Sequence, residues 1–271
     1  MKQKLKLGAV LSVFEPGEIL ENFEKTKVFI QKAAKAQCDL LVFPELNLTG
    51  YVTGKTVCKT AVQSDFYLIK ELEFLSLDYR ISFLCGFAEK KEGKVFASHG
   101  FFSNGKLKGV YRKIQPGPPE LSHLTPGNDF PVFDFLGWKF GIQLCFDAHF
   151  PEISTIMAKK GAELLIMPHA SPRGTPGEKF ESWKRHLLAR AYDNGVYVIP
   201  VNQSGLNKNN LYFPGVSFLV SPSGKVEDVC LEDKESIAYF KADKLKIHEV
   251  KSHRMRYFFQ YRRGKFYKEN L

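Results

Sequence analysis

The chain has 271 residues, 44% of them hydrophobic and 25% charged, and its formal charge is +10 at pH 7. This composition predicts a soluble globular protein, and no apolar run approaches the roughly 20 residues that a membrane-spanning helix needs. The positive charge leaves an anionic partner, such as nucleic acid or an acidic substrate, open.

The five cysteines lie far apart and form no C-x-x-C pair. An odd number at such spacing favours reduced thiols in a cytoplasmic protein over a disulfide framework or a zinc site. The apolar patch near the N-terminus is short, is interrupted by Lys6 and alternates as a strand does, so we do not expect a signal peptide. The ligand clusters that a metal or an organic cofactor needs are missing from the sequence, and we expect neither.

The first half of the chain alternates strands with helices. Residues Leu5–Val13 predict the first strand, and Gly17 opens a helical segment with one apolar face. That face comprises Ile19, Leu20, Phe23, Ile30, Ala33 and Ala34. The segments that follow are a strand covered on both faces at Asp39–Phe43, a helix at Ala61–Leu77, strands at Ile81–Ala88 and Val95–Phe102, a hairpin turn at Asn104-Gly105, and a strand at Leu107–Tyr111.

The second half begins with a long loop, Gln115–Pro131, which is rich in Pro and Gly and has no periodicity. Loops of this length inside a domain tend to be functional. The remaining predicted elements are strands Val132–Phe135, Trp138–Leu144, Glu163–Met167, Val196–Val201, Val216–Val220, Lys225–Val229 and Ile237–Phe240, and helices Glu152–Lys159 and Lys179–Asn194. Two similar halves predict a single α/β domain over residues 1–271, built as a four-layer α-β-β-α sandwich of two mixed sheets with helices on the outer faces.

Residues 250–271 interleave basic and aromatic side chains. The basic ones are Lys251, His253, Arg254, Arg256, Arg262, Arg263, Lys265 and Lys268, and the aromatic ones are Tyr257, Phe258, Phe259, Tyr261, Phe266 and Tyr267. Such alternation can bind single-stranded nucleic acid through stacking and phosphate contacts, and it equally fits an edge strand or a docking tail. We favour a docking tail, because no nucleic-acid motif accompanies the charge.

Three predicted strands end in reactive side chains, namely Glu45, Lys113 and Cys145. Ligand sites of open α/β sheets gather beyond the strand ends. A carboxylate, an ammonium and a thiol that meet there supply a base, an electrostatic stabiliser and a nucleophile, as thioester chemistry requires. Each residue alone has a simpler interpretation, since Glu and Lys are usually exposed and free Cys is usually buried.

Cys145 also stands between an apolar strand and a helix that begins near Pro151. Backbone N–H groups and a helix N-terminus lower the pKa of a nearby thiol, so we expect the thiolate to be favoured there. The same donors can receive the oxyanion that forms when the sulfur attacks a carbonyl group.

Several short motifs occur in one order along the chain. They are Phe43-Pro44-Glu45, Tyr111-Arg112-Lys113, Glu120 followed by Thr125-Pro126-Gly127, Leu144-Cys145-Phe146-Asp147 with Phe150-Pro151-Glu152, Ala189-Arg190-Ala191-Tyr192-Asp193-Asn194-Gly195, and Phe213-Pro214-Gly215 before Ser221-Pro222-Ser223-Gly224. Each is weak alone, but the set is specific in this order and spacing. Over nearly its whole length the chain therefore resembles the nitrilase, or carbon–nitrogen hydrolase, superfamily and its amidase-like branch.

The resemblance implies a catalytic triad of Glu45, Lys113 and Cys145. Glu45 is then the general base, Lys113 and the backbone N–H of Phe146 stabilise the oxyanion, and Glu120 positions Lys113 and the substrate nitrogen. The implied reaction is acylation of the cysteine, release of ammonia or an amine, and hydrolysis of the thioester. A homodimer or higher homo-oligomer, with the tail in the interface, is implied as well.

The segment His169-Ala170-Ser171-Pro172-Arg173-Gly174 matches the position of a variable substrate-specificity segment in the family. Arg173 can clamp a substrate carboxylate through a bidentate contact or can be a solvated loop residue, and both interpretations stay open. Ser171 can contact the substrate or cap the loop. His169 is a candidate here too, although we favour a hydrogen-bonded structural role over that of a second base.

We therefore expect a hydrolase that cleaves the non-peptide C–N bond of a small linear amide or N-carbamoyl compound. A small nitrile is the alternative substrate, since the same triad serves nitrile hydrolysis. The alternative from another class is a binding protein that acts through its basic aromatic tail.

Overall fold

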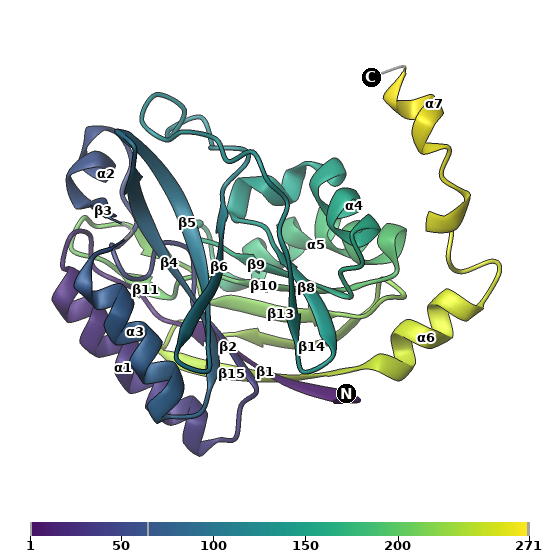
Figure 1. Cartoon of the computed structure of the whole chain (residues 1–271), viewed down its shortest axis with the longest axis horizontal. Coiled ribbons are helices and arrows are strands. Elements are labelled where there is room, and N and C mark those ends of the chain that lie inside the picture. Colours follow the sequence, from purple (N-terminus) through teal and green to yellow (C-terminus); the bar gives the residue numbers. More distant parts are fainter. Residues whose placement is uncertain (1, 64, 270–271) are drawn as a thin grey trace.

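Two β-sheets pack face to face in the computed structural model, which describes residues 2–63 and 65–269 (Figure 1). Helices cover the outer face of each sheet, so the layers run α-β-β-α as expected. Residues 270 and 271 of the expected tail lie outside the described residues. Among the helices that are described, none is both long and apolar enough to cross a membrane.

The first sheet has the strand order β15-β1-β2-β4-β5-β6, with β3 paired to β4. Its strands are β1 (Lys4–Leu11), β2 (Leu40–Val42), β3 (Val62–Gln63), β4 (Ser82–Lys91), β5 (Lys94–Ser103), β6 (Lys106–Arg112) and β15 (Ser236–Asp243). Strand β2 pairs in parallel with β1 and β4, and all its side chains are buried, which explains its unbroken apolar run. The hairpin at Asn104-Gly105 is confirmed, with φ values of 51° and 73°.

The second sheet has the order β14-β13-β10-β9-β8-β7. Its strands are β7 (Val132–Phe135), β8 (Trp138–Ile142), β9 (Leu164–Pro168), β10 (Tyr197–Val201), β13 (Val216–Val220) and β14 (Val226–Leu231), and the short strands β11 (Gly205–Leu206) and β12 (Tyr212–Phe213) pair separately. Strands β8, β9 and β10 run parallel, so their carboxyl ends meet at one edge of the sheet.

Helices α1 (Ile19–Lys35) and α3 (Tyr67–Asp78) pack on the first sheet, and α4 (Pro151–Lys159) and α5 (Pro176–Asn194) cover the second (Figure 1). The prediction of one helix over Ala61–Leu77 is partly wrong. The short helix α2 (Lys55–Thr60) and strand β3 precede α3, because the backbone at β3 pairs with β4 instead of continuing a helix.

One residue of the expected apolar face of α1 is also misplaced. Leu20 is 62% exposed, whereas the polar residues Asn22 and Thr26 are buried. Both are buried because their side chains bond to neighbouring segments: Asn22 Oδ1 accepts the N–H of Glu15 at 2.8 Å, and Thr26 Oγ1 accepts Asn47 Nδ2 at 3.1 Å.

Aromatic rings fill the space between the two sheets. Phe101 of β5 meets Phe133, Phe135 and Phe140 of the opposite sheet at ring-centroid distances of 5.7, 5.8 and 5.0 Å. These steep, edge-on contacts add attraction beyond the burial of the rings. Because the rings come from both sheets, they fix the spacing of the sheets and therefore the placement of the strand ends.

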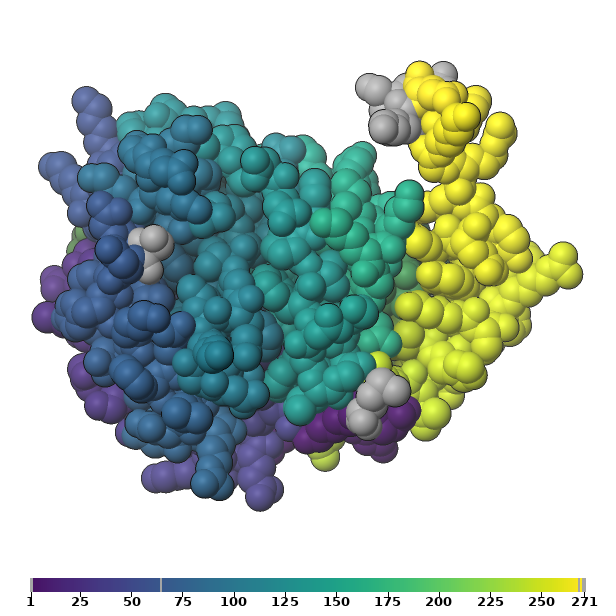
Figure 2. Space-filling model, in the orientation of Figure 1, coloured from purple at the N-terminus to yellow at the C-terminus, as the bar shows by residue number. Residues whose placement is uncertain are grey.

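The chain leaves the sandwich after β15 through α6 (Lys244–Ser252), a helix that the sequence analysis did not predict. The segment beyond it contains η2 (Phe259–Tyr261) and α7 (Gly264–Lys268), and Figure 2 shows α7 standing clear of the body. The large apolar side chains between α6 and α7 include Met255, which is 69% exposed, and Tyr261, which is 57% exposed.

Candidate active site

Three strand ends bring Glu45, Lys113 and Cys145 together at one edge of the sandwich. Glu45 follows β2, Lys113 follows β6, and Cys145 opens the short helix η1 (Cys145–His149) after β8. Lys113 Nζ lies 2.9 Å from Glu45 Oε1 and 2.7 Å from Glu120 Oε2, and all three of these side chains are buried. The charges of Glu45, Lys113 and Glu120 also act on the Cys145 thiol, so the four groups share one site.

Glu45 is a buried carboxylate with one unused oxygen. Burial raises its pKa to about 7, the ammonium of Lys113 opposes that rise, and the charge of Glu120 adds to it. Within the described residues, Glu45 Oε2 has no hydrogen-bond partner, which is costly for a buried oxygen unless a ligand or a water molecule uses it. The backbone is held on both sides, since its N–H donates to His169 O and its carbonyl accepts from Gln203 Nε2, each at 3.3 Å.

Lys113 remains an ammonium throughout the neutral pH range. Burial alone would lower its pKa, but the carboxylates of Glu45 and Glu120 hold that pKa well above its usual value. Glu120 Oε2 also accepts the N–H of Gly117 at 2.6 Å. The long loop between β6 and β7 therefore delivers the second carboxylate of the site, as a functional loop is expected to do.

The thiol of Cys145 sits on a turn with φ of 44°, a left-handed conformation that is uncommon for residues with a side chain. Burial, followed by the charge of Glu45, raises the pKa of the thiol to about 12, although Lys113 opposes the rise. The expectation of a favoured thiolate is therefore wrong. Loss of water around the sulfur and a neighbouring carboxylate outweigh the helix N-terminus and the ammonium, so the thiol needs a base when it attacks.

Phe146 follows Cys145 in η1, and its half-buried ring lies 5.5 Å from each of the rings of His149 and Phe150. The first N–H groups of a helix have no acceptor within the helix itself. The backbone N–H of Phe146 is therefore in a suitable position in the chain to donate to an oxyanion beside the thiol.

Asp147 joins the turn around the thiol to the first sheet. Its Oδ2 accepts the O–H of Tyr111 at 2.7 Å and the N–H of Leu144 at 2.9 Å, and its Oδ1 accepts the N–H of Gln115 at 2.7 Å. Burial raises the pKa of Asp147 to about 6, and the Tyr111 hydrogen bond opposes that rise. This pair is not apparent in the sequence, because only the fold brings an Asp after β8 beside a Tyr on β6.

His169 is buried within the expected substrate segment. Its Nδ1 lies 2.6 Å from the carbonyl oxygen of Met167, and its ring centroid lies 4.1 Å from that of Trp183. Burial lowers its pKa to about 3, so the imidazole is neutral. These contacts match the structural role that we favoured for this histidine.

Asn202 fixes the backbone of Ser171 in the substrate segment. Its side chain accepts a hydrogen bond from the N–H of Ser171 at 2.9 Å and donates one to the carbonyl oxygen of Ser171 at 3.0 Å. Ser171 Oγ accepts a hydrogen bond from Lys179 Nζ at 2.9 Å. Arg173 is exposed, has φ of 72°, and donates its N–H to the carbonyl of Tyr212. Binding of a substrate carboxylate by Arg173 stays a prediction, and Lys179 is a second cation that the sequence analysis missed.

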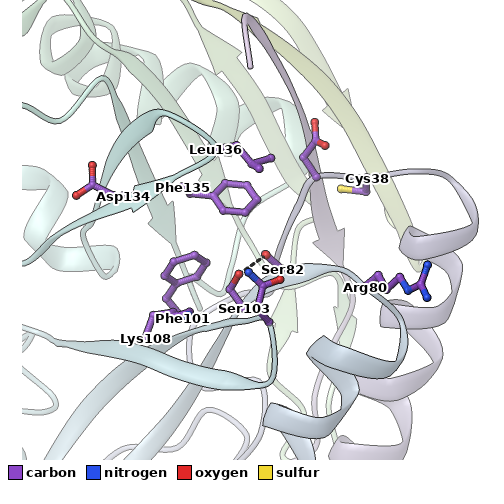
Figure 3. A pocket seen from close by; sticks show the side chains of 11 residues that line it. Cys38, Arg80, Ser82, Phe101, Ser103, Lys108, Asp134, Phe135 and Leu136 are labelled. Carbon is purple, nitrogen blue, oxygen red and sulfur yellow. Dashed lines mark hydrogen bonds between the residues drawn. The ribbon is translucent and has the colours of Figure 1, made fainter. Parts of the chain in front are cut away.

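A cavity of about 370 Å³ lies at the opposite end of the strands (Figure 3). Its lining includes Cys38 before β2, Ser82 at the start of β4 and Ser103 at the end of β5, and the two serine hydroxyls lie 2.8 Å apart. Glu45 follows the other end of β2, so this cavity is separate from the candidate active site.

Known proteins resemble this chain over most of its length. A model of the carbon–nitrogen hydrolase family matches residues 15–251. A probable nitrilase of Schizosaccharomyces pombe is 30% identical over 263 residues, which cover 94% of each chain. The omega-amidase NIT3 of Saccharomyces cerevisiae is 28% identical and covers 88% of this chain and 87% of its own. The solved structure of an amidase from Nesterenkonia sp. shares the fold, with a TM-score of 0.84 at 21% identity over 100% of this chain and 98% of that one.

Replacement of Tyr111 by Phe tests the link between Asp147 and β6. We expect the free energy of unfolding to fall by about 1–3 kcal/mol, because a buried carboxylate loses a hydrogen bond. The bond favours ionised Asp147, whose pKa is about 6, so the loss should be larger at pH 8 than at pH 5. Urea denaturation at both pH values measures this, with Tyr239→Phe, a partly exposed tyrosine, as the control. Equal losses in the two variants would contradict the link.

Proposed function

The chain belongs to the carbon–nitrogen hydrolase family, and on that premise we propose that Glu45, Lys113 and Cys145 are its catalytic triad. The reaction is hydrolysis of the non-peptide C–N bond of a small linear amide or N-carbamoyl compound, by way of a cysteine thioester. One observation carries the assignment: a buried ammonium bridges Glu45 and Glu120, while the second oxygen of Glu45 has no hydrogen-bond partner among the residues that the structure describes, in a site that also holds the thiol.

Acylation begins with a neutral thiol. As the sulfur of Cys145 bonds to the carbonyl carbon, Glu45 accepts the thiol proton and the carbonyl oxygen becomes an oxyanion. The Lys113 ammonium and the N–H of Phe146 stabilise that charge. Glu45 then gives the proton to the substrate nitrogen, the C–N bond breaks, and ammonia or an amine leaves the thioester behind.

Deacylation uses the same groups in a second round. Glu45 accepts a proton from water as the water oxygen attacks the thioester carbon. The C–S bond breaks, the sulfur recovers its proton from Glu45, and a carboxylic acid is released. Glu120 keeps Lys113 in place and orients the substrate nitrogen, in keeping with its hydrogen bond to the ammonium at 2.7 Å.

Replacement of Cys145 by Ser or Ala should abolish turnover and leave the fold intact. Ammonia release is measured on a panel of ω-amides, N-carbamoyl compounds, simple amides and nitriles, and intact mass detects an adduct on the protein. Cys58→Ser, which changes an exposed thiol, should keep wild-type activity. Full turnover in a Cys145 variant would contradict the nucleophile assignment. Turnover of nitriles alone by the wild-type protein would favour the nitrilase alternative.

The ionisation of Glu45 should control the pH dependence. The carboxylate accepts the thiol proton only when it is ionised, and its pKa is about 7, so kcat/KM should fall about tenfold per pH unit below pH 7. Glu45→Gln should lower the rate of acylation by roughly 10²-fold or more at every pH, because an amide cannot accept the proton. Stopped-flow and intact-mass measurements check this, with the exposed Glu71→Gln as the control. Undiminished acylation in Glu45→Gln would count against the base.

We further propose that the protein is cytoplasmic and forms a homodimer in which the tail, residues 250–271, docks on a second copy of the chain. Five free thiols support the compartment. The exposed aromatic and basic side chains of the tail, whose α7 end stands clear of the body in Figure 2, support the docking.

Deletion of residues 253–271, which leaves α6 whole, should convert the dimer to a monomer in light scattering coupled to size-exclusion chromatography. The reason is that the tail supplies exposed aromatic contact area for the interface. Fluorescence polarisation with a single-stranded oligonucleotide is the control for the other use of such a tail. An unchanged oligomeric state, together with salt-dependent oligonucleotide binding that the deletion removes, would contradict docking and favour the binding-protein alternative.

A further inference from the structure

Lys179 is a half-buried ammonium in the first turn of α5. That turn carries the positive end of the helix dipole and disfavours a lysine, whereas Glu178 beside it caps the helix as expected. Lys179 Nζ donates to Ser171 Oγ at 2.9 Å and to Pro172 O at 3.0 Å. An ammonium has three protons, and within the described part of the chain Lys179 makes no ion pair with a carboxylate.

The position of Lys179 relative to the thiol follows from the loop that it bonds. His169 O accepts the N–H of Glu45 at 3.3 Å, and the N–H of Ala170 is directed at the thiol of Cys145. Ser171 is the next residue, about 3.8 Å further along the Cα trace. Its hydroxyl accepts a hydrogen bond from the Lys179 ammonium, which lies close enough to Cys145 for the two groups to interact electrostatically when the sulfur is ionised.

The charge balance of the site gives this ammonium a use. Two buried carboxylates, Glu45 and Glu120, face one buried ammonium, Lys113, so the site carries a net negative charge when both carboxylates are ionised. A neutral amide meets little opposition, but a substrate that carries a carboxylate is repelled unless a further cation receives it. Lys179 is such a cation, and Asn202 holds the loop to which it is bonded.

We propose that Lys179 binds a carboxylate of the substrate, so that the enzyme prefers amides or carbamoyl compounds with an acidic group a few atoms from the scissile carbonyl. The proposal rests on the function proposed above. Two substrate types share this chemistry. In the monoamide of a dicarboxylic acid the carboxylate stays on the thioester, whereas in an N-carbamoyl amino acid it leaves with the amine.

The test compares kcat/KM for matched acidic and neutral substrates. The monoamide of a dicarboxylic acid is paired with its methyl ester, and an N-carbamoyl amino acid is paired with its methyl ester. The variants are Lys179→Met, which keeps the length of the side chain without its charge, and Lys179→Arg, which keeps the charge. Lys184→Met is the matched control, because Lys184 is on the same helix and pairs with Glu181 at 2.8 Å.

The wild type should prefer the acidic member of one pair, and Lys179→Met should lower the ratio of acidic to neutral kcat/KM by roughly tenfold or more, as loss of a charge-assisted hydrogen bond predicts. Lys179→Arg should keep much of the preference, and Lys184→Met should keep all of it. An intact-mass adduct that retains the carboxylate identifies the monoamide as the substrate type, and an adduct without it identifies the carbamoyl type.

Three outcomes would overturn the inference. The first is unchanged kcat/KM for both acidic and neutral substrates in Lys179→Met. The second is an equal fall of kcat/KM for both, which indicates a purely structural role in the loop. The third is a preference for acidic substrates that Arg173→Ala removes and Lys179→Met keeps. In each of them hydrolysis through Cys145 persists, so the proposed function stands. The absence of ammonia release and of any adduct with every substrate would contradict the proposed function itself.

Discussion

The candidate active site depends on one buried ammonium, Lys113, that two carboxylates share. Removal of one partner from a buried ion pair typically costs about 3–5 kcal/mol, while the intact pair adds little net stability. Glu45 ends β2 and Lys113 ends β6, so their 2.9 Å contact requires the strands between them to keep register. Glu120 reaches the same ammonium only because the loop after β6 folds back. The arrangement is therefore better explained by chemistry than by stability.

The second sheet supplies Cys145, the proposed nucleophile, and hydrogen bonds between layers keep it aligned with the Lys113 ammonium. On one side of the turn, Asp147 accepts a hydrogen bond from the O–H of Tyr111 on β6. On the other side, Arg190 of α5 donates to the carbonyls of Ala148 at 3.1 Å and His149 at 3.0 Å, near the end of η1. The thiol and Glu45 are buried between the layers, away from water, and this burial raises the pKa of both groups. A carboxyl group that titrates near pH 7 can take a proton from sulfur and return it to nitrogen.

Local patterns predicted much of the fold. The apolar run at β2 and the Asn104-Gly105 turn leave few alternatives, because burial on both faces and two positive φ angles each demand particular residue types. The patterns failed where tertiary contacts decide the secondary structure. Val62 pairs with β4 although it lies in a helical pattern. The helix α6 buries only Ile247 and Val250, so its apolar pattern is too weak to predict it. The positions of Glu45, Lys113 and Cys145 at strand ends were predicted from the sequence. The raised pKa of the thiol was not predicted, because it depends on burial that no motif encodes.

Reactive groups and substrate-recognising groups are specified in different ways in this chain. The proposed triad occupies strand ends, which the sheets hold in fixed positions, so the spacing of the three residues in the sequence already points to them. Cations near the substrate segment lie on a loop and on the first turn of a helix. Arg173 has the better residue type for a carboxylate, yet its side chain is exposed. Lys179, eight residues after Ser171, donates a hydrogen bond to the hydroxyl of that serine beside the site. The sequence does carry one sign of this, a lysine at the positive end of a helix, where a cation has no helical reason to be. With these proposed roles, recognition can change through the start of α5 while the chemistry at the strand ends stays the same.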